Sequence, residues 1–278
     1  MILGRIEDIK KQMLNFDTKL VIMEIEQFIK KYFEETKTKK LIIGLSGGID
    51  SSTTLKLAVD AVGPDNVLAL VMPHYGITEK ADIEDAYMVA DKFGVECITI
   101  ELADVCGLIK QKLVPYVDVG TKPYGNIIAR TRMITLYAFS NSMNGIVLGT
   151  SDKSEKLIGY FTKWGDAAAD IFPIVDLYKT QVRIIAKELG VPDKIIAKPS
   201  SPGLWRGHKA EEEIGMSYDR IDSILYALVE LNILPDDLKK IGGVSPSEVD
   251  RIIELMQMSM HKRTSSYPEV QKLIKKTS

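Results

Sequence analysis

The sequence has few of the features that mark disulfide-rich or nucleic-acid-binding proteins. Only two of its 278 residues are cysteine, and the formal net charge is −2 with a pI near 6.0. Cys97 and Cys106 form neither a CxxC pair nor a disulfide framework, which argues against a paired-cysteine sulfur-transfer centre. The near-neutral charge gives no sign of the excess of basic residues that binding to duplex nucleic acid or an anionic membrane requires. Any anionic ligand must therefore be bound by local basic groups.

Long hydrophobic runs are also missing. The N-terminal segment Met-Ile-Leu-Gly-Arg-Ile-Glu-Asp is interrupted by charge, unlike a signal peptide, and no apolar run approaches transmembrane length. No internal repeat, low-complexity tract or Pro/Ser-rich linker divides the chain. We therefore expect a cytoplasmic protein with no nucleic-acid or membrane partner, in which residues 1–278 form a single domain with a substantial core.

The most informative segment is residues 44–52, which read Gly-Leu-Ser-Gly-Gly-Ile-Asp-Ser-Ser. It follows the apolar run 41–43 and precedes a helical pattern that ends at Gly63 and Pro64. Gly47 and Gly48 let the backbone approach a ligand without side-chain obstruction, and three serines add hydroxyl donors near the amides of a helix N-terminus. The segment predicts a phosphate-binding turn between a strand and a helix.

Asp50 changes the chemistry expected of this turn. The segment is not a Walker A motif, because it carries Asp50 where that motif would need a Gly-Lys-Ser/Thr ending. A carboxylate beside a phosphate cradle would repel its ligand unless a divalent cation lay between them, so Asp50 implies Mg²⁺. The alternative is that Asp50 only caps the helix.

The rest of the chain alternates between strand and helix signals. We predict helices at 19–33 and 79–93 and strands at 41–43, 66–72, 95–100 and 145–149. Such alternation indicates an α/β fold with a doubly wound, mainly parallel sheet and helices on both faces. Ligands bind beyond the carboxyl ends of such strands, so the Ser46 loop and the segment after Leu148 should face one site. Residues 199–215 should form a long mobile loop that acts as a lid.

Two further segments carry polar residues that suit this site. Arg130 lies on an apolar helical stripe, where its planar fork needs either a ligand anion or an acid across an interface. In residues 149–180, Glu155 could share Mg²⁺ with Asp50, and Lys163 and Lys179 could supply the positive charge that the glycine loop lacks. Any one of these residues could instead belong to a solvated surface loop.

The glycine loop resembles the Ser-Gly-Gly-x-Asp-Ser signature of the ATP pyrophosphatase superfamily, whose fold is described as adenine nucleotide alpha-hydrolase-like. Within that superfamily the chain resembles NAD synthetase, which amidates nicotinic acid adenine dinucleotide (deamido-NAD) with ATP. The likeness extends to Gly-Asn-Ile-Ile-Ala-Arg-Thr-Arg-Met, Gly-Tyr-Phe-Thr-Lys-Trp-Gly-Asp, Leu-Tyr-Lys-Thr-Gln, Gly-Met-Ser-Tyr-Asp and His-Lys-Arg. The resemblance implies a homodimer that uses ATP, deamido-NAD and ammonia, with Mg²⁺ as the cofactor.

The resemblance also assigns roles to individual residues. It implies that ATP is bound by Gly44, Leu45, Ser46, Gly47, Gly48, Ile49, Asp50, Ser51, Thr150, Lys179 and Ser201. It implies that deamido-NAD is bound by Arg130, Lys163, Asp170, His261 and Lys262, near the dimer interface. Asp50 and Glu155 would hold the metal and, with Lys179, form the catalytic set. Asp166 is our candidate for the group that handles the ammonium proton.

The remaining alternatives concern the substrate and the nitrogen donor. Other ATP pyrophosphatases, such as a GMP synthetase core or a tRNA-modifying enzyme, and a nucleotide-binding sensor without turnover stay open at this point. Glutamine hydrolysis generally needs an activated nucleophile, and neither Cys97 nor Cys106 lies in a suitable polar setting, so we expect free ammonia as the donor. Residues 203–208 depart from the acidic version of the loop in many bacterial relatives, which leaves Trp205, Arg206 and His208 without an assigned role.

Overall fold

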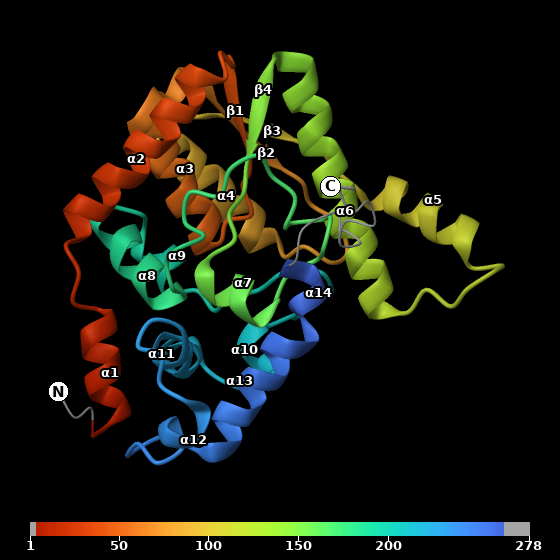
Figure 1. Cartoon of the computed structure of the whole chain (residues 1–278). Coiled ribbons are helices and arrows are strands. Elements are labelled where there is room, and N and C mark those ends of the chain that lie inside the picture. The colour runs from red at the N-terminus through yellow and green to blue at the C-terminus, as the bar shows by residue number, and fades with distance from the viewer. Residues whose placement is uncertain (1–3, 264–278) are drawn as a thin grey trace, which may run out of the picture.

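A four-stranded parallel sheet forms the centre of the protein (Figure 1). The computed structural model describes residues 4–263. The strands lie in the order β3-β2-β1-β4, and in chain order they are β1 (Lys40–Gly44), β2 (Val67–Val71), β3 (Glu96–Thr99) and β4 (Gly145–Leu148). The chain moves outward from β1 to β3 and then returns to the other side of β1, so the strand order reverses beside β1. This confirms the predicted doubly wound, parallel arrangement.

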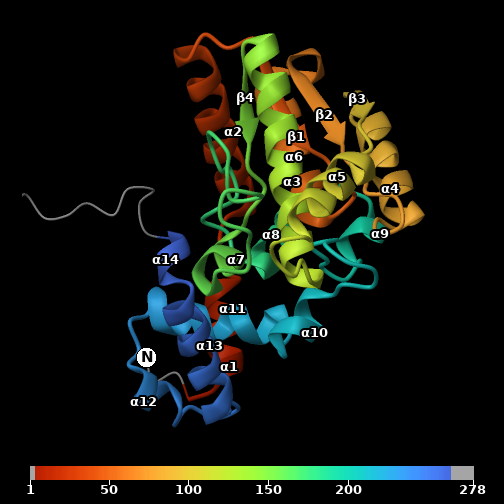
Figure 2. The same cartoon turned by 90° about the vertical axis from the view of Figure 1, so that its right-hand side faces the viewer.

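Helices cover both faces of the sheet because its strands are apolar on both sides. Leu41 and Ile43 of β1 pack into one core with α2 (Thr18–Glu35), α3 (Ile49–Val62), α4 (Lys80–Lys92) and α8 (Lys179–Glu188). The intervening Ile42 faces the other core, which includes α5 (Ala103–Leu113) and α6 (Thr121–Met143). The alternation follows the period of two of a β-strand, and Figure 2 shows α6 crossing over the strands.

A helical layer with its own apolar core lies beyond the carboxyl ends of the strands (Figure 2). Its helices are α1 (Ile6–Met13), α10 (Ala210–Ile214), α11 (Tyr218–Val229), α12 (Pro235–Leu238), α13 (Pro246–Met258) and α14 (Met260–Arg263). Two short helices, α7 (Lys153–Ile158) and α9 (Asp193–Ile196), connect it to the sheet layer. The prediction that residues 199–215 form one continuous loop was wrong, because α10 occupies its end and buries Ala210 and Ile214.

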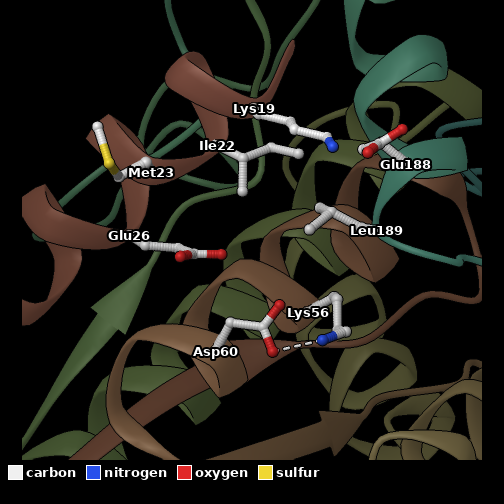
Figure 3. A pocket seen from close by; sticks show the side chains of 8 residues that line it. All are labelled: Lys19, Ile22, Met23, Glu26, Lys56, Asp60, Glu188 and Leu189. Atoms are coloured by element: carbon white, nitrogen blue, oxygen red, sulfur yellow. Dashed lines mark hydrogen bonds and ion pairs between the residues drawn. The ribbon is translucent and has the colours of Figure 1, made fainter.

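The amphipathic helix predicted at 19–33 is α2, and it packs on α3 and α8 of the same chain. A shallow pocket lies between these three helices, and Figure 3 shows Glu26 of α2 facing the paired side chains of Lys56 and Asp60 on α3. Burial and the nearby charge of Asp60 raise the pKa of Glu26. This pocket shares no residue with the glycine loop. Within residues 4–263, none of the helices combines the length and the apolar character that crossing a bilayer requires.

Candidate active site

The loop between β1 and α3 has the strand, turn and helix arrangement predicted from its sequence. Gly48 is the N-cap of α3, and the Ser46 and Ser51 hydroxyl oxygens lie 3.0 Å apart across the turn. Gly47 has φ +73°, and a Cβ at this position would lie 2.3 Å from the carbonyl oxygen of Asp82. Only glycine fits there without displacing α4. The turn therefore leads directly into the first amides of α3, which have no partner within the helix and suit an anion.

A cavity of about 460 Å³ opens at the carboxyl ends of the strands. The glycine loop, α6, the segment after β4 and parts of residues 198–213 form its walls. Most of the residues assigned to ATP from the sequence line it, namely Gly44, Leu45, Ser46, Gly48, Ile49, Asp50, Ser51, Thr150 and Ser201. Lys179 does not line the cavity itself but contacts Asp50, which does. The structure thus brings together segments that lie more than 100 residues apart in the sequence.

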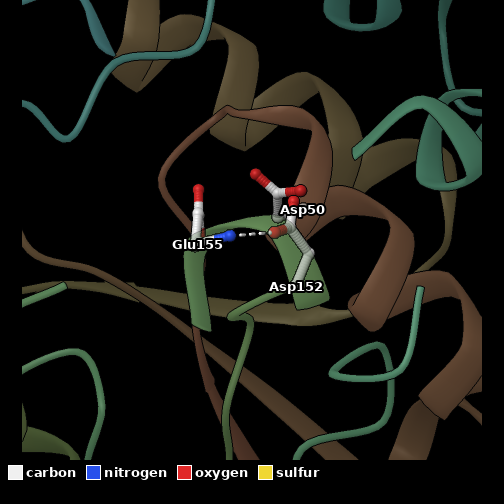
Figure 4. Close-up of side chains that lie close together, drawn as sticks. All are labelled: Asp50, Asp152 and Glu155. Atoms are coloured by element: carbon white, nitrogen blue, oxygen red, sulfur yellow. Dashed lines mark hydrogen bonds between the residues drawn. The ribbon is translucent and has the colours of Figure 1, made fainter. Parts of the chain in front are cut away.

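Three carboxylates converge on Lys179 beside the glycine loop. Its Nζ lies 2.6 Å from Asp50 Oδ2, 2.9 Å from Asp152 Oδ2 and 3.0 Å from Glu155 Oε1. Asp50 comes from the first turn of α3, Glu155 from α7 and Lys179 from the start of α8. Figure 4 shows the three acidic side chains close together, and Asp152 also accepts a hydrogen bond from the backbone N of Glu155 at 2.8 Å.

The cluster contains three acidic groups and one basic group. Burial raises the pKa of both Asp152 and Glu155, and the neighbouring negative charges raise it further. Burial alone would lower the pKa of Lys179, but the charges of Asp152, Asp50 and Glu155 outweigh it and raise that pKa well above its usual value. Lys179 is therefore a cation throughout the physiological range, yet it can balance only one of the three acidic groups.

The cluster fits a divalent cation. One ligand oxygen from each of Asp50, Asp152 and Glu155 lies within 4.8 Å of the others, and carboxylate oxygens are the donors that Mg²⁺ prefers. In addition, Asp50 Oδ1 is buried and has no hydrogen-bond partner among residues 4–263. Asp152 was not predicted as a site residue, although it caps α7 and an Asp before a helical segment is a common N-cap.

The residues expected to bind the dinucleotide lie mostly outside this cavity. Arg130 donates to the carbonyl oxygen of Lys163 at 3.2 Å, and Lys163 Nζ donates to the carbonyl oxygen of His261 at 2.7 Å. Asp170 accepts hydrogen bonds from Tyr137 and from the backbone N of Val147. Lys262 alone of the predicted set lines the cavity. Arg130, Lys163 and His261 thus form one exposed group on the surface, which adjoins the cavity through Lys262.

Arg132 and Asp166 are two charged residues that line the cavity wall. The Nε of Arg132 donates to the carbonyl oxygen of Met72 at 3.2 Å, and no carboxylate among the described residues lies within ion-pair distance of it. Asp166 accepts a hydrogen bond from the backbone N of Thr162 at 2.9 Å, and the residue is exposed. Its role in handling ammonium stays a prediction.

Contacts with Glu213 of α10 hold the segment that precedes this helix against the cavity wall. Glu213 accepts hydrogen bonds from His208 Nε2 at 2.8 Å and Tyr160 OH at 2.9 Å, and it forms an ion pair with Lys122 at 2.7 Å. These contacts outweigh burial and lower the pKa of Glu213 to about 2. The Trp205 ring stacks on His208 with their centroids 3.3 Å apart. Trp205 and His208, which had no assigned role, therefore line the cavity from this segment.

Neither cysteine has the surroundings of a nucleophile. Cys106 of α5 is fully buried against α6, and its thiol donates to the hydroxyl oxygen of Thr131 at 3.5 Å. Cys97 is half-buried on β3, and burial raises the pKa of its thiol. A raised pKa disfavours the reactive thiolate. The expectation that these cysteines do not activate glutamine agrees with their positions.

The chain resembles proteins that make nicotinamide nucleotides. The sequence profile of the family described as NAD synthase matches residues 21–266. The NH(3)-dependent NAD(+) synthetase of Staphylothermus marinus is 46% identical over 256 residues, which cover 92% of each protein. Among solved structures, NMN synthetase from Francisella tularensis matches with a TM-score of 0.81 at 32% identity, covering 92% of this chain and 99% of that one. An NH3-dependent NAD synthetase from Campylobacter jejuni, in complex with the nitrate ion, matches with a TM-score of 0.76 at 30% identity, covering 92% and 100%.

Proposed function

The chain belongs to the NAD synthase family, and from this we propose that it catalyses the ATP-dependent amidation of deamido-NAD by ammonia. The products are NAD, AMP and pyrophosphate. The observation that supports this most directly is the placement of Asp50, Glu155 and Lys179 beside the glycine loop at a single cavity. This arrangement combines an anion cradle with a cluster of charged groups, as phosphoryl and adenylyl transfer require.

In the proposed reaction, the nicotinate carboxylate attacks the α-phosphorus of ATP. A carboxylate oxygen to phosphorus bond forms, the bond to the β-phosphate oxygen breaks, and pyrophosphate leaves. Ammonia then attacks the carbonyl carbon of the acyl-adenylate, loses a proton, and displaces AMP to leave the amide. No covalent enzyme intermediate is needed, so the protein acts by positioning and by stabilising charge.

The residues of the cavity divide between these tasks. The glycine loop, Thr150 and Ser201 would bind ATP. Lys179 contacts the three carboxylates from their buried side and would hold them in place for the metal. Arg132 is a further basic group of the cavity wall, and it could supply the charge that the loop lacks. Asp50 and Glu155 would hold Mg²⁺, which when bound stabilises negative charge on the leaving pyrophosphate.

Deamido-NAD would approach from the surface group of Arg130, Lys163 and His261. Its acidic end would enter the cavity past Lys262, which lies at the border between the two regions. Lys262 donates hydrogen bonds of 2.8 Å to the carbonyl oxygens of Gly159 and Phe161, so its ammonium is held in place before a substrate arrives. The exposure of this surface is why we also propose a homodimer in which a second copy covers the bound dinucleotide. Sedimentation of the purified protein tests the homodimer. We further propose a cytoplasmic location, which cell fractionation tests.

A second candidate substrate is the corresponding mononucleotide, because one of the similar structures is an NMN synthetase. The higher identity to an NAD synthetase favours the dinucleotide. Competition between nicotinic acid mononucleotide and deamido-NAD at equal concentration would separate the two, and the larger kcat/KM identifies the substrate.

The central experiment supplies purified protein with ATP, Mg²⁺ and deamido-NAD. Ammonium chloride should support NAD formation with AMP as the co-product, whereas glutamine freed of ammonia should not. Equal rates from the two donors would contradict ammonia as the direct donor. Absence of both AMP and NAD with every donor would contradict the proposed function itself and favour a binding protein without turnover.

A further inference from the structure

Helix α11 carries a buried carboxylate, Asp222, that makes none of the proposed ligand contacts. Its side chain is fully buried in the helical layer beyond the strands. Oδ1 accepts a hydrogen bond from the Ser154 hydroxyl at 2.5 Å, and Oδ2 accepts one from the backbone N of Thr180 at 2.8 Å. The Ser154 hydroxyl oxygen in turn accepts a hydrogen bond from the backbone N of Lys179 at 2.9 Å.

These contacts join the two segments that carry the charged cluster. Ser154 directly precedes Glu155 in the first turn of α7, and Thr180 directly follows Lys179 in the first turn of α8. The first amides of a helix have no partner within the helix and must be satisfied from outside. Here Asp222 and Ser154 satisfy two such amides of α8, in a place that water does not reach. One carboxylate therefore sets the relative position of both helix starts.

Packing alone does not account for an acidic side chain at this position. Most of the buried residues of α11 are apolar, among them Ile221, Ile224 and Leu225. Among residues 4–263, no basic side chain lies within ion-pair distance of Asp222. Burying a carboxylate without a cation destabilises the fold unless hydrogen bonds compensate for the lost water. The hydrogen bonds that Asp222 accepts come from Ser154 and Thr180, which are adjacent in sequence to Glu155 and Lys179.

We propose that Asp222 is a positioning residue of the adenylation site. Through Ser154 and Thr180 it holds the first turns of α7 and α8, and thereby keeps Glu155 and Lys179 in place beside the glycine loop. This inference rests on the proposed function, because it assigns a step to the groups that Asp222 positions. A displacement of about 1 Å in such groups can lower a rate a hundredfold.

The test compares variants of Asp222 with a matched control on the same helix. Asp222→Ala removes both acceptors, whereas Asp222→Asn keeps an acceptor for Thr180 but cannot reproduce both contacts. Ser223→Ala is the control, since Ser223 is equally buried but donates its hydroxyl to the carbonyl oxygen of Asp219 within α11. Ser154→Ala, alone and combined with Asp222→Ala, shows whether the two residues act through one network.

We expect Asp222→Ala to lower kcat by about tenfold to a hundredfold and to weaken binding of ATP with Mg²⁺. Asp222→Asn should be intermediate, and the affinity for deamido-NAD, measured by calorimetry, should stay within about twofold. Combining Ser154→Ala with Asp222→Ala should lower kcat little further than Asp222→Ala alone, because both variants break the same connection. Ser223→Ala should behave as the unmodified protein.

Two results would overturn the proposal. One is a folded Asp222→Ala variant with unchanged kcat and unchanged ATP affinity. The other is equal weakening of ATP and deamido-NAD binding, which would indicate general structural damage. If Asp222→Ala does not fold, Asp222→Asn and Ser154→Ala decide the question by the same measurements. Failure of the unmodified protein to make NAD would instead contradict the proposed function, while the calorimetric comparison of ATP binding would still test the role of Asp222.

Discussion

Replacing Asp50 by asparagine should remove most of the adenylation activity while the protein stays folded. Asp50 is one of three carboxylates around Lys179, and its side chain is mostly buried. When all three acids are ionised, they and the one ammonium carry two net negative charges, which suit one divalent cation. Asp50→Asn lowers that charge by one without changing the shape of the side chain, and Lys179 keeps its contacts with Asp152 and Glu155. The free energy of unfolding should therefore change little.

The size of the effect follows from the spacing of the charges. The ligand oxygens lie within 4.8 Å of one another. A cation held between them would lie no farther than about that from the Asp50 oxygen, and at 4.8 Å with an effective dielectric constant of about 20 a carboxylate and one unit of positive charge attract each other by about 3.5 kcal/mol. A change of that size in the activation free energy lowers the rate by between about a hundredfold and a thousandfold. Removal of single preorganised groups at other active sites has effects of about the same size.

The assay is the rate of AMP and pyrophosphate formation as a function of Mg²⁺ concentration. Asp60→Asn is the matched control, because Asp60 lies on the same helix, pairs with Lys56 and does not line the cavity of the glycine loop. The control should keep full activity. AMP formation by Asp50→Asn that equals that of the unmodified protein at limiting Mg²⁺ would refute the assignment of Asp50 to the metal.

Three other predictions concern the substrate, the glycine loop and residues 201–209. Arg130→Ala should weaken deamido-NAD binding by about tenfold or more and leave ATP binding unchanged; calorimetry that shows the reverse would place Arg130 at the other site. Gly47→Ala should lower both stability and ATP affinity by about 1–3 kcal/mol, because of its positive φ and the close carbonyl oxygen of Asp82; an unchanged melting temperature would contradict this. Burial lowers the pKa of His208, so the contribution of its neutral form to the ordered position of residues 201–209 should be complete above about pH 6.5 and should be lost as the pH falls through the folded pKa. Trp205 fluorescence should report the loss of this order, and a signal that stays flat between pH 7 and 5 would argue against it.

The sequence predicted the parts of the fold that depend on local patterns. The apolar runs of the strands and the helical periodicity of α3 and α4 are properties of neighbouring residues, and they identified the parallel sheet. No helix was predicted at α1 or at α7 to α14. Most of these helices bury their apolar residues in the separate core beyond the strands, so the pattern of neighbouring residues alone carried little information about them.

The candidate site was predictable where a motif concentrates its chemistry in one segment. The glycines, serines and Asp50 of the loop are adjacent in the chain, and their residue types alone indicate an anion with a cation beside it. By itself, then, the sequence determined the strand, the turn, the helix start and the kind of ligand they suit. These features depend on backbone conformation and on side-chain chemistry within about ten residues.

Only the tertiary structure decided how these groups combine. Lys179 lies 129 residues from Asp50 in the sequence, yet its ammonium contacts that carboxylate. Asp152 contacts Lys179, and Asp222 accepts hydrogen bonds from Ser154 and Thr180. Both contacts form because buried polar groups, which water does not reach, need partners within the protein. Charge balance and hydrogen-bond satisfaction are properties of the folded interior, where residues far apart in the chain share one low-dielectric space.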